Sequence, residues 1–259
     1  MAREVSNYHA FSDEDDFEEV DSYFCGCIPR MPNPAEQLTS DERIAMSAIK
    51  TSASMPFDSS NSDHEDLLSK YWRCAFKDEE PPKETTNSNW QRLGFQSGNP
   101  RTDFRGGGLL SLQQMIYLAE MHPRNFQMMI EDCNSERGYL LSACLINLTQ
   151  LLVCFLRLDG GSQHHPVIGR KSAPRECIKT FARLANEQAR PQHCFDELYA
   201  ACAIRMHREW MRQWDPKAGE KNLLRFNHIL GDVKKAVENL LKNSRIRLLS
   251  EFSYLYSEA

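Results

Sequence analysis

The chain has 259 residues, 41% of them hydrophobic, and a net charge of -5, so it holds enough apolar material for a folded core. Its charge is unevenly placed: residues 1–21 carry a net charge of -7, which leaves the rest nearly neutral at +2. No block of basic residues occurs, which argues against a nucleic-acid-binding protein.

Residues 1–61 have the composition of a tail. An acidic run is followed by three prolines between positions 29 and 34, and then by a serine-rich patch at 51–62. Such segments offer little apolar surface to bury. We therefore predict that 1–61 is largely disordered, that 62–259 forms one domain, and that residues 1–60 can be deleted without loss of the fold.

One short helix is expected to interrupt this tail. Ser40 could cap a helix over 41–50, with Ile44, Ala48 and Ile49 on one face. A helix this short needs other elements to hold it.

The nine cysteines are scattered, and no secretory signal peptide is evident, so we expect a cytosolic protein with reduced thiols. Four cysteines in apolar surroundings are expected to be small core residues: Cys144, Cys154, Cys177 and Cys202. Cys25 and Cys27 are either two exposed thiols without a special role or a site of S-acylation that could support peripheral membrane association.

Apolar residues recur at helical spacing from position 63 onward. Beyond the segments discussed below, helices are expected at about 63–75, 174–185, 195–214, 221–241 and 244–256. No stretch alternates apolar and polar residues as a surface strand would. The sequence predicts an all-α fold.

The segment 139–158 is apolar and about as long as a membrane span. Asn147 and Gln150 lie near its middle, where lipid would leave their amides unsatisfied. We therefore expect a buried helix at the centre of a soluble bundle. Asn147 and Gln150 should then find hydrogen-bond partners on neighbouring elements, which gives Asn147 a structural role.

The most distinctive stretch runs from Trp90 to Tyr117. It begins with an aromatic anchor, Trp90 and Phe95, and continues into a turn. There Pro100 restricts Asn99 to extended geometry, and Thr102 and Asp103 are natural turn and N-cap residues.

The same stretch ends in Arg105, followed by three glycines and an amphipathic helix that is expected to run to about residue 120. Gly106, Gly107 and Gly108 would allow another molecule to approach the backbone closely. A loop could present Arg105 at this point.

Motifs for other functions are weak or missing. The adjacent His164 and His165 have no third spaced ligand, and His193, Cys194, Cys202 and His207 would point to different faces of a helix, so we predict no metal site. GxxxxGK[ST], GxSxG and HExxH do not occur. We expect no cofactor and no self-contained active site.

The stretch resembles the signature of the ELMO domain, the engulfment and cell motility domain, as found in small ELMO-domain-containing (ELMOD) proteins. The matching residues are Trp90, Leu93–Gln96, Pro100, Thr102–Gly106, Gly108, Leu109 and Leu112, then Ile146–Thr149, Phe195–Tyr199 and Trp210. Asn99 stands where the family usually has an acidic residue, and Ser111 where it often has glycine.

This resemblance implies a GTPase-activating protein (GAP) for Arf-family small GTPases, with Arg105 as its arginine finger. Such an activator supplies one residue to its partner's active site and is not an enzyme with a site of its own. The partner would be the GTP-bound GTPase, met in the cytoplasm or at internal membranes during membrane traffic or cytoskeletal events. Asn99, Thr102, Asp103 and the three glycines would contact the GTPase or shape the loop.

Two alternatives stay open. Arg105 could instead brace the loop, by pairing with Asp103 or by capping nearby carbonyls. The domain could also be a non-catalytic interaction module, because larger ELMO proteins act in a scaffold with a Rac exchange factor.

Overall fold

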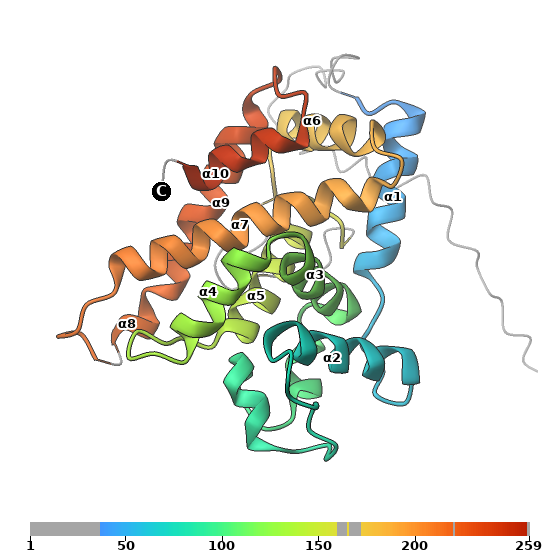
Figure 1. Ribbon diagram of the computed structural model, residues 1–259. Helices are drawn as coiled ribbons and strands as arrows, with labels where there is room; N and C mark the ends of the chain where they lie inside the picture. Colours follow the sequence, from blue (N-terminus) through green and yellow to red (C-terminus); the bar gives the residue numbers. More distant parts are fainter. Residues whose placement is uncertain (1–36, 160–164, 166–171, 220, 258–259) are drawn as a thin grey trace, which may run out of the picture. The chain divides into compact units, whose positions relative to one another are not determined.

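Helices are the regular elements of the part of the chain that the computed structural model describes, residues 37–159, 165, 172–219 and 221–257 (Figure 1). The α-helices are α1 (Ser40–Ala53), α2 (Ser62–Ala75), α3 (Gly108–Met121), α4 (Pro123–Cys133), α5 (Leu141–Phe155), α6 (Arg175–Asn186), α7 (Pro191–Gln213), α8 (Lys221–Leu224), α9 (Phe226–Lys242) and α10 (Tyr254–Ser257). Three short 3-10 helices accompany them: η2 (Ser88–Leu93), η3 (Pro100–Arg105) and η4 (Leu249–Ser253). The predicted all-α fold is confirmed.

Helix α7 is the element on which the others pack. It contacts α1, α3, α5, α6 and α9, and Figure 1 shows it crossing between them. The expected apolar stripe is buried along it: Phe195, Leu198, Tyr199, Cys202, Met206 and Trp210. Trp214 lies just past its end in extended backbone and is only partly buried.

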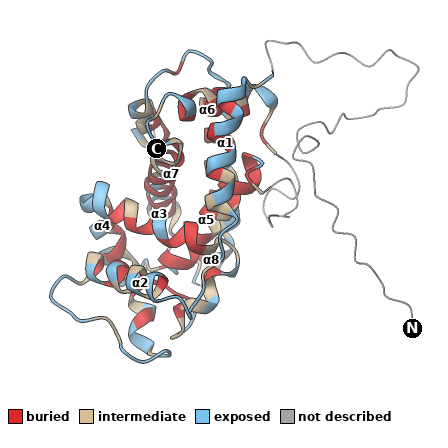
Figure 2. Cartoon of the chain, turned by 90° about the vertical axis from the view of Figure 1, so that its right-hand side faces the viewer, coloured by how far each residue is buried: buried red, intermediate tan, exposed pale blue. Residues whose placement is uncertain are grey.

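Helix α5 is the expected buried helix. All of its side chains are buried except Asn147 and Gln150, and Figure 2 shows it in the buried colour. It runs from Leu141 to Phe155. Its 15 residues are fewer than the apolar segment 139–158 that contains it. Among the residues described, no helix has both the length and the apolar character required to cross a bilayer.

Helix α1 corrects the expected boundary after residue 61. The helix is capped by Thr39 and not by Ser40, through a capping box with Glu42. Ala45, Met46 and Ile49 belong to the hydrophobic core, and α1 packs on α3, α6 and α7. Of the three residues expected to share one face, only Ile49 is buried: Ile44 is 68% exposed, and Ala48 is exposed as well.

The domain therefore includes α1. The unit that contains all the described helices is Pro34–Ala259. Deletion of residues 1–60 would remove this buried surface, so we expect it to destabilise the fold, contrary to the prediction from composition. Residues 1–36, and with them Cys25 and Cys27, lie outside the described part of the chain.

Helix α4 was not predicted. Pro123 occupies its first turn, where the missing N–H costs nothing, and Phe126, Met129 and Ile130 form its buried face. The i, i+3, i+4 spacing was present in the sequence, but the helix has only 11 residues and follows α3 without a loop.

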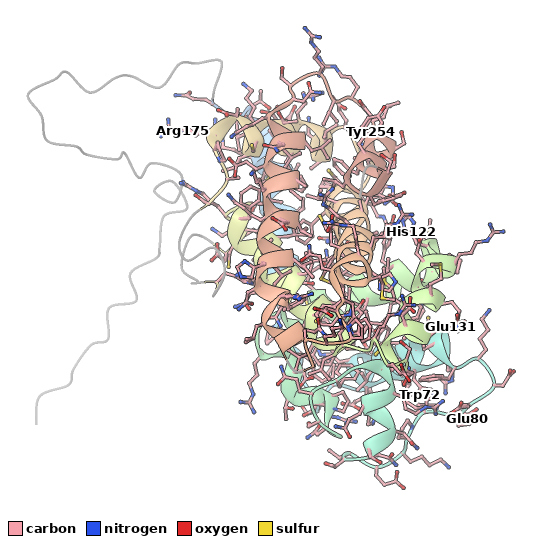
Figure 3. All side chains as sticks on the ribbon, turned by 90° about the vertical axis from the view of Figure 1, so that its left-hand side faces the viewer. Trp72, Glu80, His122, Glu131, Arg175 and Tyr254 are labelled. Carbon is pink, nitrogen blue, oxygen red and sulfur yellow. The ribbon has the colours of Figure 1, made fainter. Side chains whose placement is uncertain are left out.

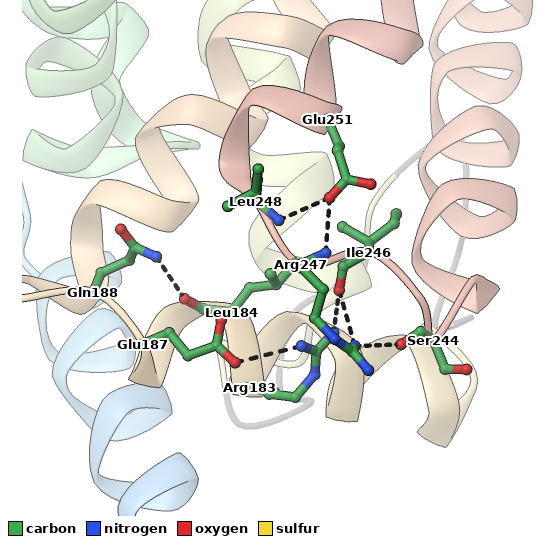
Figure 4. A network of polar contacts seen from close by, with 9 residues as sticks. All are labelled: Arg183, Leu184, Glu187, Gln188, Ser244, Ile246, Arg247, Leu248 and Glu251. Carbon is green, nitrogen blue, oxygen red and sulfur yellow. Dashed lines mark hydrogen bonds and ion pairs between the residues drawn. The ribbon is translucent and has the colours of Figure 1, made fainter.

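The two helices expected at the end of the chain are each interrupted. The first breaks at Arg225 into α8 and α9. In the second, residues 243–248 are not helical, because their carbonyl groups bond to side chains. Arg183 donates to Ile246 O, and Arg247 donates to Ser244 O at 2.7 Å (Figure 4). Glu251 then accepts from two backbone N–H groups, of which Leu248 N lies 2.8 Å away, and starts η4.

The four cysteines expected in the core are buried: Cys144, Cys154, Cys177 and Cys202. Burial raises the pKa of the Cys177 thiol to about 11 and that of Cys154 to about 12. Thiols with such high pKa values are poor nucleophiles at neutral pH. They act as small apolar residues, as expected.

Candidate functional site

The stretch that stood out in the sequence folds as η2, a tight turn and η3, and it is anchored by aromatic rings. Trp90 and Phe95 are buried, at 2% and 0% exposure. The Trp90 ring meets the Trp72 ring edge to face, with 5.3 Å between centroids, and Phe95 meets Phe104 at 5.9 Å; Trp72 is labelled in Figure 3. Such contacts favour one arrangement of the rings, which fixes the base of the loop.

The turn after η2 is attached to the first turn of α5. Gly94 has φ +78°, and a Cβ at this position would lie 2.2 Å from Leu141 N. Both the left-handed backbone and the close approach require glycine. Two bonds complete the attachment: Ala143 N donates to Gly94 O at 3.2 Å, and Ser142 Oγ donates to Leu93 O at 2.6 Å.

Asn99, Thr102 and Asp103 hold the loop closed. Asn99 has the extended backbone that Pro100 requires, and its side chain caps η3 by accepting from Arg101 N at 3.3 Å. Thr102 Oγ1 donates to Asn99 O at 2.8 Å. Asp103 does not cap the following helix as expected. Its carboxylate instead accepts from Gln96 N at 2.8 Å, across the turn.

Gly107 and Gly108 are close to other parts of this chain. Gly108 has φ +55°, and a Cβ there would lie 2.4 Å from the backbone oxygen of Met55. Leu109 N also donates to Met55 O, at 2.9 Å. A Cβ on Gly107 would lie 2.7 Å from Ser111 Cβ. At these two positions glycine permits a close approach within the chain, and a contact with a GTPase stays a prediction.

The two arginines of the loop have opposite environments. Arg101 is partly buried, and its guanidinium donates from Nε to Glu65 Oε1 at 2.7 Å, from a second nitrogen to Glu65 Oε2, and from a third to Thr85 O at 3.0 Å. Arg105 is exposed and makes no hydrogen bond or ion pair with any residue that the structure describes. The alternative in which Arg105 pairs with Asp103 is therefore not what is observed.

Asn147 has a different partner from the one expected. Its Nδ2 donates to Ala143 O at 2.8 Å, one turn back in α5 itself, and not to a neighbouring element. The side chain is half-buried. It can stay polar because the helix surface is open there.

A polar cluster that the sequence analysis missed joins α3 to α7. Tyr117 Oη donates to Glu197 Oε1 and lies 3.1 Å from His193 Nδ1, while His122 Nε2 lies 3.9 Å from Glu197 Oε2 (His122 is labelled in Figure 3). Burial, and then the bond to Glu197, raise the pKa of Tyr117 well above its usual value. No motif signals this cluster, since its members are scattered from α3 to α7.

The other histidines that the structure describes do not form a metal site. His207 Nδ1 lies 3.0 Å from Tyr139 Oη, and His207 Nε2 lies 3.3 Å from Asp132 Oδ2. Among the described residues, no group of three or more potential ligands could hold a metal ion. His165 is buried, and His164 lies outside the described residues.

A pocket of about 610 Å³ lies where α2 ends and α4 begins. Its wall includes Cys74, Lys77, Glu79 and Phe126, and none of its lining residues belongs to the loop at 88–108. Burial raises the pKa of the Cys74 thiol, which makes it a weak nucleophile. The described structure thus offers one exposed, unpaired arginine on a rigid loop, and no grouping of catalytic side chains around this pocket.

These features define an all-α domain whose candidate site is an arginine-bearing loop on a braced base. The chain belongs to the ELMO/CED-12 family: a sequence model of that family matches residues 47–230. The match includes the whole loop, helices α2 to α8, the second half of α1 and the start of α9.

Curated relatives carry the same domain name. The chain is 26% identical to ELMO domain-containing protein 1 of Pongo abelii over 216 residues, which are 76% of this chain and 59% of the relative. It is 32% identical to ELMO domain-containing protein 2 of Homo sapiens over 113 residues, 42% of this chain and 37% of the relative. It is 29% identical to ELMO domain-containing protein B of Dictyostelium discoideum over 126 residues, 49% of this chain and 44% of the relative.

The chain thus spans between about a third and three fifths of the length of these relatives. No solved structure matches it.

Proposed function

We propose that this protein is a GTPase-activating protein for Arf-family small GTPases and that Arg105 is its arginine finger. Membership of the ELMO/CED-12 family supports the proposal, because the loop at 90–109 resembles that of ELMOD proteins, which act on these GTPases. The observation that carries it is the contrast between two arginines. Arg101 donates to both Glu65 and Thr85 O, whereas Arg105 is exposed and unpaired among the described residues.

The chemistry requires little more than this arginine. GTP hydrolysis accumulates negative charge on the transferred phosphoryl group, and a guanidinium inserted by a partner stabilises that charge, raising the rate by roughly 10³–10⁵-fold. The planar guanidinium presents two N–H donors to two phosphoryl oxygens in a fixed geometry, whereas the ammonium group of lysine is a compact point charge on a flexible stem. The nucleotide, its magnesium ion and the attacking water would all belong to the GTPase.

A rigid base suits this role. A finger contributes only if its position in the transition state is already set before the reaction begins. The buried rings beneath the loop and the bond from Gln96 N to Asp103 hold the backbone before Arg105, and the bond from Leu109 N to Met55 O holds it after. The guanidinium itself remains available to a partner. We further propose that the protein acts in the cytoplasm and reaches internal membranes through its GTPase.

The test is GTP hydrolysis over a panel of purified Arf and Arf-like GTPases, with Rac as a control outside the family. At least one Arf-family member should be stimulated by the wild-type chain, and Arg105→Lys should lose most of that stimulation. Stimulation of no GTPase, together with binding to a Rac exchange factor, would favour the interaction-module alternative.

A further inference from the structure

Helix α5 reaches the protein surface at two amide side chains. Asn147 and Gln150 are its only half-buried residues, and every other side chain from Leu141 to Phe155 is buried. Residues three apart on a helix share a face. The surface opening of this otherwise apolar helix is therefore lined by two carboxamide groups.

This opening lies against the loop that bears Arg105. A Cβ built on Gly106 would lie 3.2 Å from Gln150 Oε1 and 3.6 Å from its Cδ, and η3 is in contact with α5. The amide of Gln150 therefore lies directly beside the residue that follows Arg105. Residues 44 positions apart in the sequence come together there.

Gly106 differs from the glycines that follow it. Its backbone is right-handed helical, with φ -87° and ψ -31°, a conformation open to every residue type. The nearest atoms to a Cβ on it are the far end of one flexible side chain, which can move aside. Among the described residues, nothing rigid requires glycine at position 106.

The two amides also keep hydrogen-bonding capacity. Gln150 makes no hydrogen bond with the residues that the structure describes, and Asn147 uses only its Nδ2, toward its own helix. A carboxamide carries a donor and an acceptor side by side, which matches the N–H and C=O of a peptide backbone.

We propose that Gly106, Asn147 and Gln150 form a docking face for the main chain of the GTPase, beside the point where Arg105 enters its nucleotide site. The proposal rests on the function proposed above. Gly106 leaves room for the Gln150 amide beside the loop, and that amide pairs with the partner backbone. Binding and chemistry are thereby divided between neighbouring residues: the amide face holds the GTPase, and Arg105 acts only on the transition state.

The test separates KM from kcat for the GTP-loaded GTPase as the substrate. Gln150→Met keeps the length and helix propensity of glutamine and removes both hydrogen-bonding groups. It should raise KM about tenfold, equivalent to ~1.4 kcal/mol, and leave kcat within about twofold. Gly106→Ala should raise KM in the same way, because its methyl group would push aside the Gln150 amide, whose Oε1 lies 3.2 Å from that position.

Two further variants serve as controls. Gln127→Met, on α4, removes an exposed glutamine amide from a helix that lines the pocket described above and should leave KM unchanged. Arg105→Ala should lower kcat with KM nearly unchanged. The dissociation constant for the GTPase loaded with a non-hydrolysable GTP analogue, measured by calorimetry, should follow KM across the series.

Wild-type KM and dissociation constant in a well-folded Gln150→Met protein would overturn the docking face, even if Arg105→Ala is inactive. If Gln150→Met instead lowers the melting temperature, the Gly106→Ala variant tests the docking face, because the backbone at position 106 tolerates alanine. An unchanged KM in that variant would then overturn the docking face. Full stimulation by Arg105→Ala would overturn the finger, and the dissociation constants would still report on the docking face independently.

Discussion

Arg101 and Arg105 lie four residues apart in the same loop, and removing each should have opposite effects. Arg101→Ala is expected to lower stability and, well below its melting temperature, to leave most of the GTPase stimulation. Arg105→Ala is expected to abolish stimulation and leave stability unchanged. The reason is the difference in their partners: Arg101 binds Glu65 and Thr85 O, whereas Arg105 binds no described residue.

The magnitudes follow from the contacts. The side chains of Arg101 and Glu65 are only 18% and 29% exposed, so their loss leaves a carboxylate and a carbonyl group with incomplete access to water. Fully buried pairs cost about 3–5 kcal/mol to break, and partial exposure reduces this to about 2–3 kcal/mol. For a domain of this size that corresponds to a fall in melting temperature of about 4–12 °C. Arg105→Ala should stay within about 0.5 kcal/mol of wild type.

The loss of GTPase stimulation in the Arg105 variants should be equally clear. One transition-state contact of this kind contributes roughly 2–4 kcal/mol or more, so Arg105→Ala and Arg105→Lys should both lose at least about 10²-fold in kcat. The assay is single-turnover GTP hydrolysis at saturating activator, with melting curves of the same preparations. If Arg105→Ala instead loses stability and partner binding together, and lysine restores both, Arg105 is a brace and the reasoning is refuted.

Three further outcomes are expected. Ile49→Ala should destabilise the fold by about 2–4 kcal/mol in denaturant unfolding, since Ile49 is fully buried; an unchanged midpoint would place α1 outside the cooperative core. Asn147→Leu should cost less than about 1 kcal/mol, because its bond is to its own helix; a larger loss would reveal a structural role. Burial lowers the pKa of His207, so stability should fall as pH drops through about 6.5. His207→Gln, which can bond to both Tyr139 and Asp132, should flatten that dependence, and an equally steep curve would exclude His207 as its source.

Much of the fold could be predicted from local sequence patterns. The helix after Pro174 and the apolar stripe from Phe195 to Trp210 were predicted because their side chains meet at fixed spacing within one helix. The candidate site was also recognisable, since an arginine before three glycines is a local feature. The extended backbone of Asn99 followed from the ring of Pro100.

Helix ends were less predictable where distant side chains take over backbone groups. Residues 243–248 have helical spacing, yet Arg183, from α6, bonds to Ile246 O and the helix does not form there. Helix α1 shows the same dependence. The sequence does not show which of its faces is buried, because Ile44 and Ala48 are as apolar as Ala45 and Met46. The contacts with α6 and α7 bury Ala45 and Met46.

What the sequence by itself determined is the family, the helical class and the presence of two arginines in one glycine-flanked loop. It could not tell the two apart, because Arg101 is engaged by Glu65, 36 residues away in another helix, and no local rule connects them. Only the tertiary structure brought Glu65 to Arg101 and left Arg105 without a partner among the described residues, and only it placed Gln150 beside Gly106. Periodicity assigns a residue to a face, whereas the role of a charged side chain depends on which distant group the packed helices bring within hydrogen-bonding distance.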